Sequence, residues 1–232
     1  VPPSPPAPEA WTALLDNGVT VDLLGVSARP SQDAPSWRPD GSPMDQRLAG
    51  GPDVVAADPD ARCRVLAARL KGVAEDGPVG IKWAFVPDVG LNFTSGNLAD
   101  AGNPRDLRCG LSLSPALAGY PTITVRLGVA AGPWTTLDEV DEVEANPSKA
   151  TLHRIPGIFQ GSDGLIVAVM HGVADQQVRL IAVTVDGREI LPDGVTGAPE
   201  RGFPVTNYRF HGLRAADVRT LRFQGRRYHW AV

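Results

Sequence analysis

The stretch TITVRLGV, Thr122–Val129, has a large apolar side chain at every second position, with Thr122, Thr124, Arg126 and Gly128 between them. Ile123, Val125, Leu127 and Val129 make up the apolar set. A period of two residues is that of a β-strand, because successive side chains of a strand point to opposite faces. The stretch therefore predicts a strand with one buried face.

Other parts of the chain repeat this pattern. GIKWAFV (Gly80–Val86) and LRCGLSL (Leu107–Leu113) alternate in the same way. Five Asp-Gly pairs lie between apolar stretches, and Val185-Asp186-Gly187-Arg188 gives the clearest hairpin signal, since Gly accepts the positive φ of such turns. Further strands are expected at 19–26, 165–171, 178–185 and 218–223.

These patterns predict an all-β protein, an antiparallel two-sheet β-sandwich that is jelly-roll-like or related. We expect a single sandwich domain over residues 11–232. A division into two subdomains near 115–150 is the alternative. One short helix is compatible with the pattern at 58–71.

That segment allows two interpretations. Cys63, Leu66, Ala67 and Leu70 have helical spacing, and Asp58-Pro59 could begin a helix that Lys71-Gly72 would end. A strand over 62–70 competes with it, although its alternation is weaker.

Composition excludes several classes of protein. The 232 residues are 43% hydrophobic and 21% charged, which is globular rather than disordered. The net charge of −4 gives no reason to expect a nucleic-acid partner. The longest apolar run, Leu165–Met170, is far shorter than the roughly 20 residues of a membrane helix, so no transmembrane segment is expected in this chain.

The first ten residues, VPPSPPAPEA, are rich in proline. Such a composition is typical of a stiff, extended spacer, so residues 1–10 are interpreted as a tether. A spacer of this kind suits a protein held outside the cytoplasmic membrane by parts that lie beyond this chain. We therefore expect an extracytoplasmic setting, periplasmic or on the cell surface, with a trimmed cytosolic fragment as the alternative.

The two cysteines, Cys63 and Cys109, leave a question open. A disulfide between them would stabilise the fold by about 4 kcal/mol in the chain-entropy model. Cys109 belongs to the predicted buried face of its strand, where a free thiol is equally comfortable. The sequence is compatible with a disulfide and with two free thiols.

No established catalytic signature occurs in the sequence, whether a nucleophile elbow, a phosphate-binding loop or a zinc-protease motif. No cofactor and no catalytic residue is therefore expected. One enzymatic alternative is a hydrolase whose site is assembled by the fold from the dispersed residues His171, Asp175 and His211 or from the acidic segment at 138–144.

An acidic segment, DEVDEVE at 138–144, concentrates carboxylates. Asp138, Asp141 and Glu142 are weak candidates for calcium ligands, but the spacing fits no EF-hand loop. A solvated acidic loop or a short helix is the favoured interpretation, and no metal is expected.

Basic residues gather at the other end. Residues 201–232 contain seven arginines and one acid. Arg226, Arg227, Tyr228 and His229 combine cations with aromatic rings that could hold phosphate or sugar-acid anions. Alternatively, these arginines lie on the exposed face of C-terminal strands and pair with the acidic segment.

Two tryptophans, Trp37 and Trp134, are expected in exposed loops, where they could contact a ligand. Burial as core residues at strand ends is the alternative.

Short stretches spread along the chain carry a resemblance to a known group of proteins. They are Trp11, NGVTVDLLGVS (Asn17–Ser27), WRPDGSP (Trp37–Pro43), GVAAGPWTT (Gly128–Thr136), VRLIAV (Val178–Val183), DGRE (Asp186–Glu189) and LRFQGRRYHW (Leu221–Trp230). Together they resemble β-rich extracytoplasmic domains of planctomycete-type bacterial proteins, carried by membrane-tethered signalling proteins of the antirepressor-peptidase or anti-sigma kind. The resemblance covers most of the chain and implies a strand at 62–70. It transfers no catalytic residue, because the zinc-peptidase motif of membrane-bound relatives does not occur here.

The expected function is recognition without chemistry. The chain would act as a binding or sensor domain of a tethered bacterial protein, with an envelope protein or glycan as its ligand. The hydrolase described above and a structural or assembly module are the alternatives.

Overall fold

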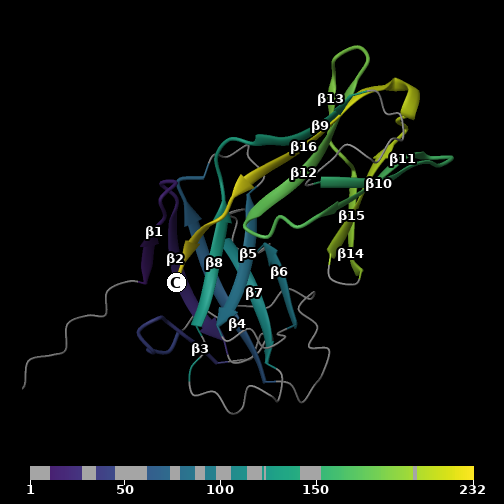
Figure 1. Ribbon diagram of the computed structural model, residues 1–232. Coiled ribbons are helices and arrows are strands. Elements are labelled where there is room, and N and C mark those ends of the chain that lie inside the picture. The colour runs from purple at the N-terminus through teal and green to yellow at the C-terminus, as the bar shows by residue number, and fades with distance from the viewer. Residues whose placement is uncertain are drawn as a thin grey trace, which may run out of the picture. The chain divides into compact units, whose positions relative to one another are not determined.

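The computed structural model describes residues 11–27, 35–44, 62–73, 79–86, 92–97, 106–113, 122, 124–141, 153–200 and 203–232. Within these residues the regular elements are β-strands, apart from one 3-10 turn at Ala215–Asp217. The strands pair antiparallel and form several open sheets (Figure 1). The predicted all-β antiparallel fold class is confirmed. No helix in this part of the chain is long and apolar enough to cross a membrane.

The chain forms two compact units. The N-terminal unit comprises Val1–Ala131 together with the last residues, His229–Val232, and the C-terminal unit comprises Gly132–Tyr228. The last residues belong to the first unit because their strand pairs with Leu127–Val129.

The N-terminal unit contains two sheets. The larger has the order β1-β2-β4-β7-β6, and β3 also pairs with β2. The smaller has the order β17-β8-β5. The strands of the larger sheet are β1 (Thr12–Leu14), β2 (Thr20–Ser27), β3 (Ser36–Trp37), β4 (Arg62–Lys71), β6 (Asn92–Asn97) and β7 (Asp106–Leu113); those of the smaller are β5 (Gly80–Val86), β8 (Thr124–Ala130) and β17 (His229–Ala231).

The alternating strands of this unit place their apolar sets against one another. Val21 and Leu70 of the larger sheet and Trp83, Leu127 and Val129 of the smaller one belong to one buried cluster. The predicted inward face of β8 is therefore the core face, and the two sheets form a sandwich.

The segment at 62–71 is a strand, β4, and the helical interpretation is wrong for these residues. Along this strand Leu66, Ala68 and Leu70 pack with the core, while Ala67 is buried in a small cluster on the other face. A strand covered on both faces has apolar residues at odd and even positions, and this produces spacings that also fit a helix. Pairing with β2 and β7 on its two sides decides the outcome.

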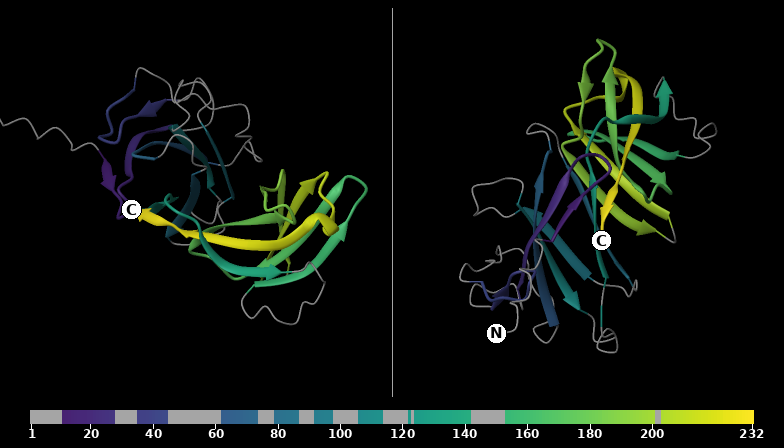
Figure 2. Two further views of the ribbon diagram at one scale, coloured as in Figure 1. Left: turned by 90° about the horizontal axis from the view of Figure 1, so that it is seen from above. Right: turned by 90° about the vertical axis from the view of Figure 1, so that its left-hand side faces the viewer.

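The C-terminal unit also contains two sheets, which form separate layers (Figures 1 and 2). One has the order β10-β11-β15-β14 and the other β13-β12-β16-β9. Their strands are β9 (Thr135–Asp141), β10 (His153–Gln160), β11 (Gly164–His171), β12 (Gln176–Thr184), β13 (Glu189–Ile190), β14 (Gly194–Glu200), β15 (Phe203–His211) and β16 (Val218–Arg227).

The core of this unit lies between its two layers. Leu180 and Phe223 come from one sheet, and Val167, Tyr208 and Phe210 come from the other. Burial raises the pKa of the Tyr208 phenol to about 12, since the interior disfavours the phenolate.

The hairpin predicted at Val185–Arg188 is present. Thr184 and Arg188 close the hairpin between β12 and β13, with Gly187 at φ +85°. The side chain of Thr184 donates to Asp186 and accepts from the backbone N–H of Arg188. Gly is needed at position 187 because other residues rarely adopt this φ.

Candidate functional site

Polar side chains from neighbouring strands contact one another on the outer face of the sheet β13-β12-β16-β9. Leu180 and Phe223 point into the core, so their neighbours along β12 and β16 point outward. Gln177 is paired with Arg226, and Arg179 is paired with Gln224. We call these four residues the Arg–Gln lattice.

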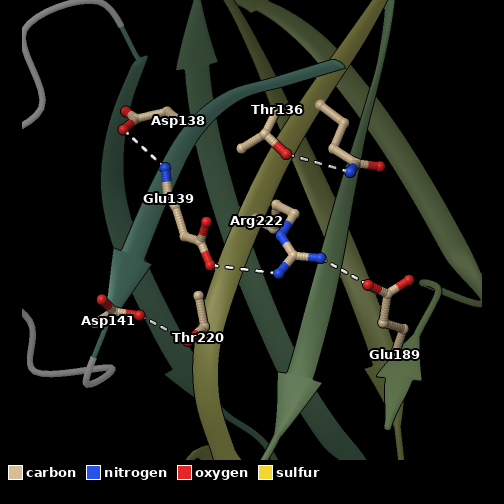
Figure 3. A network of polar contacts seen from close by, with 8 residues as sticks. Thr136, Asp138, Glu139, Asp141, Glu189, Thr220 and Arg222 are labelled. Atoms are coloured by element: carbon tan, nitrogen blue, oxygen red, sulfur yellow. Dashed lines mark hydrogen bonds and ion pairs between the residues drawn. The ribbon is translucent and has the colours of Figure 1, made fainter. Parts of the chain in front are cut away.

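Each arginine of the lattice is held by the glutamine opposite it. Arg179 donates from Nε to Oε1 of Gln224 at 2.8 Å. Arg226 donates from Nε and Nη2 to Oε1 of Gln177 at 2.8 and 2.6 Å. Gln224 in turn donates to the hydroxyl of Thr136 on β9 at 3.4 Å (Figure 3). The guanidinium groups are thus oriented by neutral acceptors, which leave their positive charge in place.

Trp134, directly before β9, lies against both arginines. The guanidinium carbons of Arg179 and Arg226 are 4.2 and 4.3 Å from the centroid of its ring. These are cation–π distances, and contact with one ring fixes the two charges near each other. Trp134 and Arg179 are half-buried, whereas Arg226 is 7% exposed.

The lattice carries concentrated positive charge. Burial lowers the pKa of Arg226, and the neighbouring charge of Arg179 lowers it further. Burial also lowers the pKa of Arg179, which Glu189 partly opposes. Both side chains keep their charge, since guanidinium groups do not deprotonate in proteins. Within the described residues no carboxylate lies within ion-pair distance of Arg179, so this end of the face favours an anion.

The other end of the same face is neutralised. Arg222 lies between Glu189, at 2.6 Å from Nη1, and Glu139, at 3.4 Å from Nη2 (Figure 3). Thr220 donates to Asp141 at 2.7 Å beside it. One residue of the acidic segment, Glu139, therefore pairs with one C-terminal arginine, Arg222, at this end.

The acidic segment is a strand as far as Asp141, so the expected loop or short helix is wrong for residues 138–141. Pairing with β16 forms this strand and places Glu139 opposite Arg222, an opposite-charge pair across the two strands. Asp138 accepts from the backbone N–H of Glu139. Among the described residues no three metal-ligating side chains converge, and Glu142 lies outside those residues.

The other predicted ligand-binding residues are dispersed. Arg227 is exposed, and Tyr228 is half-buried, with its pKa raised by burial and lowered in part by Arg226. His229, on β17, and Trp37, on β3 and 36% exposed, belong to the N-terminal unit.

Of the six predicted residues, the structure brings Trp134 and Arg226 together in one cluster. Gln177, Arg179 and Gln224 were missed. The signal that could have found them is the period-two spacing of Gln177 and Arg179 on one strand and of Gln224 and Arg226 on another.

The proposed hydrolase residues do not converge. His211 is paired with Gly164, the first residue of β11, whereas His171 is the last residue of that strand. The length of β11 separates them by about 23 Å at roughly 3.3 Å per residue. His171 is buried with its ring 5.5 Å from that of Phe223, and Asp175 is exposed.

The pairing register also bears on the cysteines. Cys63 on β4 is opposite Ser112, and Cys109 on β7 is opposite Leu66. The offset between the two cysteines is about 10 Å along neighbouring strands. The Cα atoms of a disulfide usually lie within about 7 Å of each other, and the side chains of both cysteines lie outside the described part of the structure, so the disulfide stays a prediction.

In comparisons with known proteins, no family model, no curated protein and no solved structure matches this chain.

Proposed function

We propose that this chain is a non-catalytic binding domain that recognises an acidic glycan through the Arg–Gln lattice and Trp134. The supporting observation is that two guanidinium groups are held against one indole ring by neutral amides. Two positive charges held close together repel each other, which raises the free energy of the unbound domain. An anionic ligand reduces this repulsion when it binds between them.

The chemistry of the lattice suits a sugar carboxylate. Arg179 uses its Nε for Gln224, and its terminal nitrogens make no hydrogen bond within the described residues. Terminal guanidinium nitrogens can donate two parallel hydrogen bonds to one carboxylate. Trp134 adds aromatic surface for the less polar side of a sugar ring.

The setting remains part of the proposal. We infer that the domain belongs to a tethered extracytoplasmic protein, in keeping with the proline-rich residues 1–10 and with a glycan ligand of the cell envelope. Fractionation of cells that carry the full gene tests this inference. Recovery of the protein from the cytosol would contradict it.

Calorimetric titration with a short oligogalacturonate tests the binding proposal, with the methyl-esterified oligomer of equal length as a neutral control. We expect saturable binding of the acidic oligomer that weakens as salt is added, and no binding of the ester. Arg179→Gln should weaken binding about tenfold or more, as expected for loss of a charge-assisted hydrogen bond.

Arg222→Gln is the matched control, because Arg222 lies on the same face but is paired with two carboxylates. It should leave the affinity within about twofold. Equal binding of the acidic oligomer and its ester would refute recognition of the carboxylate. Tighter binding of a poly-glutamate peptide than of the oligogalacturonate would favour a protein ligand instead.

A further inference from the structure

The N-terminal unit contains a cavity of about 700 Å³ between the inner faces of its two sheets. Residues of β1, β2 and β4 line one side, and residues of β5, β8 and β17 line the other. This volume falls within the roughly 300–1,000 Å³ typical of small-molecule sites. The cavity is separate from the Arg–Gln lattice, which belongs to the other unit.

The side chains that line the cavity are uncharged and mostly apolar. Leu23, Leu66 and Val125 face the core yet are only partly buried. The small side chain of Ala68 leaves room beside them. Partly exposed apolar side chains on inner faces are costly, and a ligand that covers them would release this cost. A charged ligand would lose its hydration without gaining a partner on this lining.

One polar atom stands out in this surrounding. Trp83 lines the cavity and is 5% exposed, and its indole nitrogen is buried without a hydrogen-bond partner. An unsatisfied buried donor costs about 1–3 kcal/mol, and native structures contain few of them. This nitrogen has almost no accessible surface, so a ligand oxygen reaches it only when neighbouring side chains shift on binding. An oxygen that then accepts from this N–H would remove the penalty.

We propose that this cavity binds a neutral, mainly apolar small molecule whose carbonyl oxygen accepts a hydrogen bond from Trp83. The apolar walls supply most of the affinity. The indole N–H selects a carbonyl compound over a hydrocarbon of the same size.

Displacement of the neutral dye Nile red from the full chain tests the proposal, with 2-undecanone and undecane as matched competitors. The ketone should compete saturably and about fivefold better than the hydrocarbon, as one net hydrogen bond implies. No displacement by either compound, or equal displacement by both, would overturn the proposal.

Blocking the cavity provides a second test. Ala13→Trp introduces a large side chain at a half-buried lining position of the short strand β1, and it should abolish binding of the ketone. Leu14→Trp is the matched control, because Leu14 is 74% exposed and is not among the lining residues. Unchanged binding by Ala13→Trp would place the ligand elsewhere.

The role of the indole is tested by Trp83→Phe, with Trp37→Phe as the control in the same unit. Trp83→Phe should remove the preference for the ketone, whereas Trp37→Phe should retain it. If Trp83→Phe fails to fold, the indole N–H resonance of Trp83 in the unaltered chain gives the answer. It should move downfield with 2-undecanone and stay in place with undecane, and an unmoved resonance at saturation would overturn the hydrogen bond.

Discussion

Arg222 and Arg179 lie on the same outer face of one sheet, but their surroundings differ. Arg222 is bonded to carboxylates from β9 and β13, at 3.4 and 2.6 Å. Arg179 is bonded to a neutral amide and stacked on an indole that it shares with a second arginine. Arg222 is therefore neutralised within the chain, whereas Arg179 has no carboxylate within ion-pair distance among the described residues.

This difference indicates which arginines can bind an anionic ligand. A guanidinium group that already has two carboxylate partners gains little from another anion, and an exposed pair of this kind adds little stability. A guanidinium group held by an amide keeps its charge for an anion from outside. Counting the arginines of the C-terminal segment does not distinguish these roles, whereas the register of β12, β16 and β9 does.

The largest expected effect comes from the core beneath both ends. Leu180 is fully buried next to Arg179 along β12, so Leu180→Ala should lower the free energy of unfolding by about 3 kcal/mol. Arg179→Gln should change it by less than about 0.5 kcal/mol, because the lost ring contact is offset by relief from Arg226. Urea denaturation measures both values. Similar losses for the two variants would contradict the separation of core from binding face.

The dependence of stability on alkaline pH tests the core independently of the arginines, because it arises from the buried phenol of Tyr208. The pKa of Tyr208 is about 12 in the folded chain and about 10 when unfolded, so the folded state holds the proton more tightly. The resulting stability is complete below pH 10 and is lost as the pH rises towards 12, by about 2–3 kcal/mol. Tyr208→Phe should flatten this decline, whereas Arg179→Gln and Arg222→Gln should preserve it. A decline of the same size in Tyr208→Phe would assign it to other groups.

A smaller effect than that of either core variant is expected at the neutralised end. Arg222→Gln should lower the free energy of unfolding by about 1 kcal/mol at most, because the Arg222 side chain is 25% exposed and its carboxylate partners more so. High salt should reduce this difference by screening, and it should leave the smaller effect of Arg179→Gln nearly unchanged. Thermal unfolding at low and high salt measures this. A larger loss for Arg179→Gln than for Arg222→Gln would reverse the comparison.

Much of the fold could be predicted from local pattern. The alternation in Gly80–Val86 and Thr124–Ala130 and the Asp-Gly turn at 186–187 correspond to observed strands and a hairpin. Residues 62–71 were ambiguous, because a strand buried on both faces loses its alternation. The acidic strand β9 was missed, because it forms by pairing with β16, which lies far away in the sequence.

The candidate site shows the same limit. Arg226 and Trp134 stood out by residue type, but Arg179 becomes part of a cluster only through the pairing of β12 with β16. The cavity of the N-terminal unit depends on which inner-face side chains remain uncovered, and a sequence pattern does not contain that information.

The most direct test of the central claim is a titration of isotope-labelled chain with a trimeric oligogalacturonate, followed by the N–H resonances of the arginine and tryptophan side chains. The account predicts saturable shifts at Arg179 Nε–H and at the indole N–H of Trp134, with the Nε–H of Arg222 unmoved. Shifts at Arg222 equal to those at Arg179, or no shift at Arg179 and Trp134 at millimolar ligand, would contradict it.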